Sequence, residues 1–229
     1  MTSRSSRILI FAVAFSVFII VPAFLSQPFP PFPLMHVADV FDLLTPFVLM
    51  VLYWQLFHDG EPAPDRRQNL AFVILGTLWV AGQAMHLAAN SINNLLGQGT
   101  TGLHDLVHFY DEVLSHYLWH LGILGLSVLL LVREAGRTAE ASERKWTLPA
   151  AVVYGLTFFL AVNEGGTVPL GLPACAVIVL GLWRYRRGAL RGRPLADFFL
   201  TGYLLALLLL MGWGIYWGGF PEFTEVGLL

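Results

Sequence analysis

Seven apolar stretches, each long enough to cross a lipid bilayer as a helix, constrain this sequence more than any motif in it. A transmembrane helix needs about 20 residues at a rise of about 1.5 Å per residue. The sequence therefore predicts an all-α, polytopic membrane protein, a bundle of seven transmembrane helices that forms a single domain over residues 1–229. The stretches lie near residues 8–26, 36–58, 69–96, 106–132, 147–163, 167–184 and 195–218.

The composition excludes the main alternatives to a membrane protein. Hydrophobic residues make up 56% of the chain, whereas Asp, Glu, Lys and Arg make up only 12%. A soluble domain of this size could not cover itself with so few polar residues, and disordered chains have the opposite composition. The single cysteine, Cys175, excludes an intrachain disulfide and a zinc site built from cysteines.

The basic residues lie only before the first stretch and in alternate connections, namely those after the second, fourth and sixth stretches. With seven helices, all of these segments lie on one side of the membrane. Since cytoplasmic segments are enriched in Lys and Arg, we expect a cytoplasmic N-terminus and an external C-terminus in the cell membrane. The 13 residues are Arg4, Arg7, Arg66, Arg67, Arg133, Arg137, Arg144, Lys145, Arg184, Arg186, Arg187, Arg191 and Arg193.

The first stretch has an alternative interpretation as a cleaved signal peptide, with Arg4 and Arg7 as its positively charged region. Its apolar run from Ile8 to Phe24 is long for such a peptide, and no small-x-small cleavage pattern follows it. We therefore expect a retained first helix.

Polar side chains line one face of the fourth stretch, where each needs a structural or functional reason because ionisable groups are costly inside a bilayer. His or Glu stands at every fourth position, which places these residues on one slowly drifting helix face. The five positions are His104, His108, Glu112, His116 and His120, with Asp111 and Ser115 beside them.

The third stretch carries a matching polar face, formed by Gln83, His86, Asn90, Asn93 and Asn94 at intervals of three or four residues. A short connection joins the two stretches, so we expect them to pack as antiparallel neighbours. Side chains at the same depth then have numbers that sum to about 200, given equal rise in both helices. This register brings the two polar faces together as one cluster that opens to the external side.

A divalent metal ion suits this cluster, because imidazole and carboxylate groups ligate zinc and residues at i and i+4 can share one ion. We expect His86, His116 and His120 to be the ligands, with Zn as the favoured metal. Glu112 or Asp111 is the expected catalytic base or a further ligand.

A water molecule activated by such an ion would make the protein a metal-dependent hydrolase. Asn90, Asn93 and Ser115 are the expected substrate-binding residues. A substrate that reaches the cluster from the lipid bilayer would itself be lipid-like.

Three alternatives stay open. Polar side chains can simply hold membrane helices together by hydrogen bonds. A haem could bind between His86 and His116. A relay through His108, Glu112, His116 and His120 would serve a proton transporter or a sensor.

The remaining polar residues give weaker indications. Asp39 and Asp42 lie at the start of the second stretch. They are expected either to stabilise the N-terminus of that helix through its dipole or to join the cluster. Glu164, at the end of the fifth stretch, could join the cluster, whereas we expect Glu222 and Glu225 to be solvated tail residues. Nothing in the sequence indicates nucleic-acid binding, and the oligomeric state is not predicted.

Overall fold

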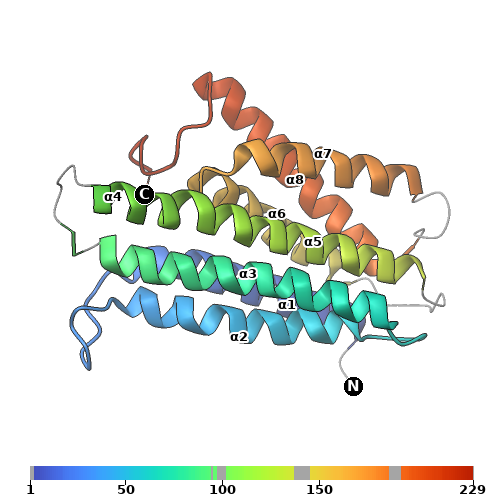
Figure 1. The fold of residues 1–229 in the computed structure, drawn as a ribbon. Helices are drawn as coiled ribbons and strands as arrows, with labels where there is room; N and C mark the ends of the chain where they lie inside the picture. The colour runs from blue at the N-terminus through green and yellow to red at the C-terminus, as the bar shows by residue number, and fades with distance from the viewer. Residues whose placement is uncertain (1–2, 94, 97–101, 137–144, 186–191, 229) are drawn as a thin grey trace.

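The predicted seven spans are present as helices in the computed structural model, which describes residues 3–93, 95–96, 102–136, 145–185 and 192–228 (Figure 1). Each is long and apolar enough to cross a bilayer, as expected of an integral membrane protein. No strand occurs in these described ranges. The helices are α1 (Arg4–Ile20, extended by the short 3₁₀ helix η1, Val21–Phe24), α2 (Val37–Phe57), α3 (Arg66–Asn93), α4 (Gly102–His108), α5 (His116–Ala135), α6 (Thr147–Glu164), α7 (Val168–Tyr185) and α8 (Pro194–Trp217).

The fourth span is interrupted by a π-helical segment. Helices α4 and α5 are joined without a break by η2, Phe109–Ser115, which is a π-helix. Segments of this kind are rare and occur frequently at functional sites. Here the segment contains Asp111, Glu112 and Ser115, three of the residues in the predicted cluster.

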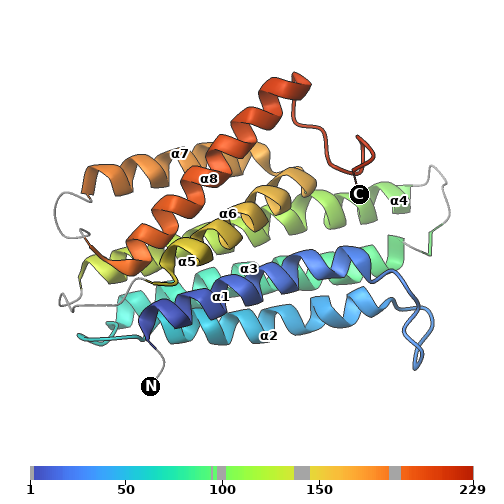
Figure 2. The same ribbon diagram turned by 180° about the vertical axis from the view of Figure 1, so that it is seen from behind.

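The first helix packs one face against α2 and α6, whereas its other face is exposed (Figures 1 and 2). The rings of Phe11 and Tyr53 are 4.7 Å apart between their centroids, and those of Phe15 and Tyr154 are 4.9 Å apart. All four side chains are fully buried. Helix α1 is thus part of the core.

Helices α3 and α5 pack side by side, as expected for the third and fourth spans (Figure 1). Their backbones approach closely at Gly82, where a Cβ atom would lie only 2.6 Å from the carbonyl oxygen of Ser115. A second close approach occurs at Gly122, where a Cβ atom would lie 2.7 Å from the backbone nitrogen of Trp79. These two glycines let the polar faces of the two helices meet.

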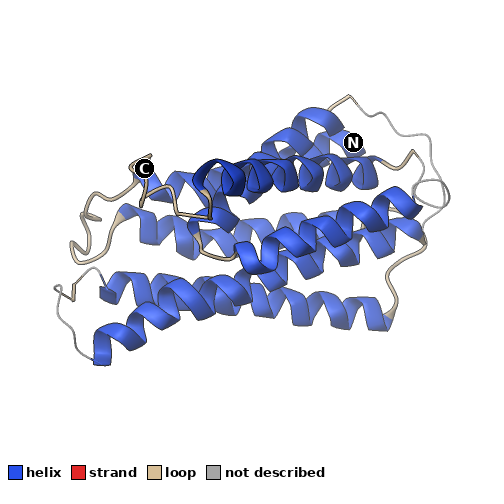
Figure 3. Cartoon of the chain, turned by 90° about the horizontal axis from the view of Figure 1, so that it is seen from above, coloured by secondary structure: helices blue, strands red, loops and turns tan. Residues whose placement is uncertain are grey.

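The connections gather at two opposite ends of the bundle (Figure 3). The N-terminus lies at one end, here called the N-terminal face, and the C-terminal segment lies at the other, the C-terminal face (Figures 1 and 2). Arg4 pairs with Glu134, and Arg7 with Asp59 at 2.8 Å, on the N-terminal face.

All the described Lys and Arg residues lie at or near the helix ends on the N-terminal face, as the charge pattern predicts. The other residues of that prediction, Arg137, Arg144, Arg186, Arg187 and Arg191, lie outside the described residues, as does Asn94 of the polar face.

Candidate functional site

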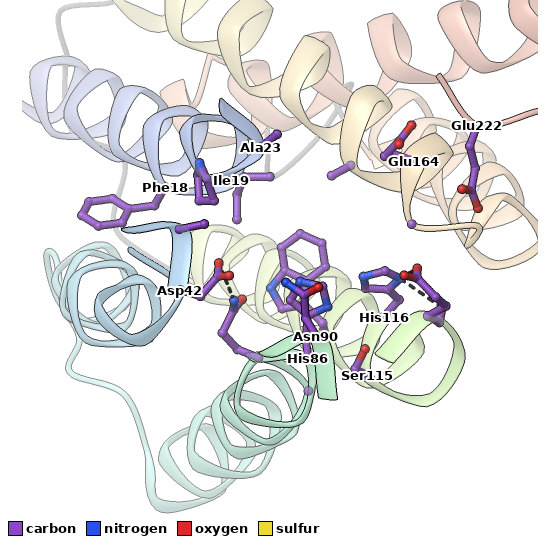
Figure 4. A pocket seen from close by; sticks show the side chains of 18 of the residues that line it. Phe18, Ile19, Ala23, Asp42, His86, Asn90, Ser115, His116, Glu164 and Glu222 are labelled. Atoms are coloured by element: carbon purple, nitrogen blue, oxygen red, sulfur yellow. Dashed lines mark hydrogen bonds and ion pairs between the residues drawn. The ribbon is translucent and has the colours of Figure 1, made fainter. Parts of the chain in front are cut away.

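A cavity of about 410 Å³ lies near the C-terminal face, among the ends of α1, α2, α3, α5 and α6 (Figure 4). Its walls carry the side chains of His86 and Asn90 from α3, Glu112 and Ser115 from η2, and His116 from α5. The polar faces of the third and fourth spans therefore meet, as predicted, and the space beside them is large enough for a small organic molecule.

The closest charged contact in the cluster joins the two spans. The His86 Nδ1 atom is 2.8 Å from Oδ1 of Asp111, at ion-pair distance although the ring N–H is not well aligned with the oxygen. Asp111 is 1% exposed, whereas the His86 side chain is 28% exposed and lines the cavity. The carboxylate thus lies behind the imidazole and occupies its Nδ1 side, which leaves Nε2 as the nitrogen available to a ligand.

The second histidine of the cavity is oriented by its own helix. His116 Nδ1 lies 3.0 Å from the carbonyl oxygen of Glu112 and 3.7 Å from its carboxylate. The His86 and His116 rings are 5.0 Å apart between centroids, with an angle of 37° between their planes. The register predicted from residue numbers is therefore confirmed for this pair.

His120 lies behind the cavity wall rather than in it. Its ring is fully buried, and Nδ1 lies 2.9 Å from the carbonyl oxygen of His116 and 3.0 Å from the Thr167 hydroxyl. An α-helix turns by about 400° over four residues, so each step of the stripe drifts by about 40°. This drift carries His120 away from the face that His116 presents to the cavity.

The other end of the stripe also lies off the cavity, on the far side of the π-helical segment. His104 and His108 stack on one another with ring centroids 6.5 Å apart, and neither lines the cavity. Among the predicted substrate-binding residues, Asn90 and Ser115 line the cavity and Asn93 does not. The Ser115 hydroxyl donates a hydrogen bond to the carbonyl oxygen of Asp111.

Three carboxylates outside the two polar faces complete the walls. Asp42 accepts a hydrogen bond of 3.2 Å from Gln83, which ties α2 to the site, whereas Asp39 caps its own helix through the His36 N–H at 2.8 Å. Glu164 lines the cavity from α6, as does Glu222 from the segment after α8.

The expectation that Glu222 is simply a solvated tail residue is wrong. Neighbouring side chains partly bury it, and this burial, together with the nearby carboxylates of Glu112 and Glu164, raises the pKa of Glu222 to about 6. Its sequence context gave no signal for this placement, because the contacts that fix it come from α6 and α8.

The described residues contain no group of three or more His, Cys, Asp or Glu side chains arranged to hold a metal ion. His86 and His116 are adjacent, but the third expected ligand, His120, points elsewhere.

No protein-family model, curated protein or solved structure matches this chain.

Proposed function

We propose that this chain is an integral membrane enzyme that performs acid–base hydrolysis of an amphiphilic substrate in the cavity near the C-terminal face. The observation that carries the proposal is the 2.8 Å contact between His86 and the buried Asp111, at the wall of a cavity of about 410 Å³. A histidine held by a carboxylate behind it is the arrangement that general-base catalysis needs.

His86 Nε2 is the proton acceptor in this proposal, and Asp111 is a positioning residue that holds the imidazole in one tautomer. A water molecule loses its proton to Nε2 as its oxygen bonds to the acyl carbon of an ester or amide. The bond to the leaving group then breaks, and the leaving group takes the proton from His86. Asn90, on the cavity wall, supplies a hydrogen bond to the substrate, whereas the buried Ser115 hydroxyl already donates to the carbonyl oxygen of Asp111.

The charge pattern supports an external position for this site. The described basic residues lie at the opposite face, which the positive-inside rule assigns to the cytoplasm. An amphiphile can reach the cavity from the external leaflet with its polar group towards His86 and its apolar part among the helices. No nucleic acid takes part in this proposal.

A bound divalent metal such as Zn is the second candidate. His86 and His116 each have Nδ1 near an oxygen acceptor, which is the usual condition of imidazoles that ligate a metal through Nε2. Glu112, which lines the cavity beside them, is the carboxylate that would join them. Neither haem nor a proton relay has a comparable observation in its favour.

A panel of fluorogenic esters, amides and phosphoesters with one acyl chain tests the proposal in dodecyl maltoside micelles. We expect the wild type to cleave at least one ester or amide, and Asp111→Asn to lower kcat by about 10²- to 10⁴-fold. His104→Ala is the matched control, since His104 lies on the same span outside the cavity, and should keep full activity. Equal activity of wild type and Asp111→Asn, or no cleavage of any ester or amide, would overturn the proposal.

Elemental analysis of the same preparations separates the two candidates. Stoichiometric metal in the wild type that is lost in both His86→Ala and His116→Ala would replace metal-free acid–base catalysis by the metal-dependent mechanism. We expect no such loss.

A further inference from the structure

The segment after α8, residues 218–228 and here called the tail, is anchored beside the cavity. The Pro221 carbonyl oxygen accepts hydrogen bonds from Asn163 at 2.8 Å and from the Trp213 indole at 2.9 Å. The Phe223 N–H donates to the Glu164 carboxylate at 2.7 Å. These bonds tie the tail to both α6 and α8.

Phe223 adds an apolar anchor to these bonds. It is 6% exposed, and its ring lies 4.7 Å from that of Trp213 and 5.6 Å from that of Phe159, between centroids. Glu222 stands between the two anchored residues, Pro221 and Phe223. Its carboxylate is therefore held at the cavity wall (Figure 4).

The charges on the cavity wall are unbalanced. Four carboxylates, those of Asp42, Glu112, Glu164 and Glu222, face two histidines, and none of the described Lys and Arg residues lines the cavity. When these four carboxylates are ionised, the wall is negative even with both imidazoles protonated, and the buried Asp111 behind it adds to this field. A cationic group is therefore favoured there and an anionic group is repelled.

The size and the apolar part of the wall decide which kind of cation fits. A volume of about 410 Å³ exceeds what a single metal ion needs, and the described residues offer no three-ligand group for one. The aromatic side chains of Phe18 and Trp119 line the same cavity. Carboxylates combined with aromatic side chains are the usual recognition site of organic ammonium groups.

We propose that the tail forms one wall of the substrate site and that Glu222 makes this site selective for an amphiphile with an organic ammonium group. The inference rests on the proposed function in one respect, that the cavity is the substrate site. It names the substrate class and adds a specificity-determining residue.

Choline and its uncharged isostere 3,3-dimethylbutan-1-ol are the probes that test the charge selectivity, with binding measured by calorimetry in dodecyl maltoside. We expect choline to bind at least about tenfold more tightly than the alcohol. Glu222→Gln should weaken choline binding about three- to tenfold and leave binding of the alcohol unchanged.

Glu225→Gln is the matched control. It removes the same charge from the same tail, it does not line the cavity, and it keeps an oxygen to accept the hydrogen bond from the Glu222 N–H. Phe223→Ala is a second variant, which releases the tail without a change of charge and should reproduce the loss of choline affinity. Equal binding of choline and the alcohol, or equal effects of Glu222→Gln and Glu225→Gln, would overturn the proposal.

Two further binding measurements distinguish a membrane-borne from a soluble ammonium compound, and an ammonium group from a metal ion. If the substrate is membrane-borne, dodecyltrimethylammonium should bind more tightly than choline, after correction for its uptake by empty micelles. Equal affinities would indicate a soluble amine as the ligand and would overturn the proposal that the substrate is an amphiphile. Stoichiometric Ca²⁺ or Zn²⁺ that displaces choline and binds more tightly would replace the ammonium assignment by a metal site.

The binding test is independent of turnover. Choline and 3,3-dimethylbutan-1-ol contain no ester or amide bond, so neither probe is hydrolysed while its binding is measured. If choline binds selectively but no substrate is hydrolysed, the proposed reaction fails while the selectivity stands. If hydrolysis depends on Asp111 but is equal for cationic and neutral substrates, only the selectivity fails.

Discussion

At the scale of single residues, the Asp111 carboxylate determines which nitrogen of His86 faces the cavity. A carboxylate beside Nδ1 favours the tautomer with its proton on that atom and leaves Nε2 as an acceptor. This is a property of the resting protein, so it can be measured before any substrate is known.

We expect Asp111→Asn to shift His86 towards a mixture of tautomers, because the amide stabilises the Nδ1 proton less than the carboxylate does. Nitrogen-15 NMR of histidine-labelled protein measures the tautomer directly. His120, whose Nδ1 lies near a backbone carbonyl and the Thr167 hydroxyl, should not change and serves as the internal control. An unaltered His86 spectrum in the variant would show that Asp111 does not orient the ring.

Glu222 gives a pH dependence whose sign follows from its raised pKa. In the docked tail the pKa is about 6, against an ordinary value of 4.5, because burial and the neighbouring carboxylates disfavour the charged form. The docked tail therefore binds the proton more tightly than the released tail. Its stability is greatest below pH 4.5 and falls as the pH rises through about 6.

Hydrogen exchange of the tail amides, corrected for intrinsic rates, checks this expectation between pH 4.5 and pH 7. Protection should decrease with rising pH in the wild type, and Glu222→Gln should remove most of the decrease. The same pH dependence in both proteins would assign it to another group.

The sequence predicted that His86 and His116 lie together in the site, but it did not predict all the residues that line the cavity. Two facing helices with a known connection fix relative depth, so His86 and His116 were matched from their numbers alone. The spacing of four residues did not reveal how far the stripe drifts, so His120 was predicted as a metal ligand although it lies off the cavity. Glu222 was missed because non-local contacts of its neighbours hold it in place.

At the scale of helices, the approach of α3 to α5 holds His86 against Asp111. Gly82 stands one turn before His86, and its Cα faces the backbone of Ser115 and Trp119. A side chain at this position must separate the two helices, since backbone atoms cannot move aside as a flexible side chain does.

We therefore expect Gly82→Ala to lower the free energy of unfolding by about 1–3 kcal/mol, as overpacking of a tight contact does. The comparison variant is Gly181→Ala on α7, where a Cβ atom would meet nothing within 4 Å and higher helix propensity should keep stability unchanged or raise it. Thermal unfolding in dodecyl maltoside measures both. Equal stability of the two variants would mean that α3 and α5 can separate without cost.

The π-helical segment could not be predicted from the spacing of its polar residues. A pattern of four fits an α-helix about as well, and nothing in Phe109–Ser115 distinguishes the two by composition. The segment places Asp111 towards α3 while Glu112 and Ser115 line the cavity. It is therefore local geometry, rather than residue type, that brings three polar groups of one short segment into the site.

At the scale of the whole molecule, the seven spans were predictable because length and apolar composition follow from the bilayer itself. The helices begin and end within a few residues of the predicted stretches; α1, for example, starts at Arg4 rather than at residue 8. That helix continues into the charged region, since Arg4 pairs with Glu134 and is held against α5. The order in which the helices lie side by side could not be predicted from the sequence, because all seven are apolar and nothing in their composition specifies which pairs make contact.

The proposed orientation predicts which face reacts from outside the cell. Glu225→Cys on the tail should be labelled by a membrane-impermeant maleimide in intact cells, whereas Glu61→Cys on the opposite face should be labelled only after permeabilisation. Both side chains are exposed, and Cys175→Ala supplies a background without cysteine. Labelling in the reverse order would place the cavity on the cytoplasmic side.

The packing of α1 against helices that lie much later in the sequence has a consequence for biosynthesis. Its partner rings on α6 and α8, such as Tyr154 and Phe198, are translated more than 140 residues after Phe11. At ribosomal speeds of about 5–20 residues per second, the first helix waits roughly 7–30 s for the neighbours that bury it. During this interval only α2, through Tyr53, can cover Phe11. The newly made chain therefore completes its interior only when the final segment has entered the bilayer.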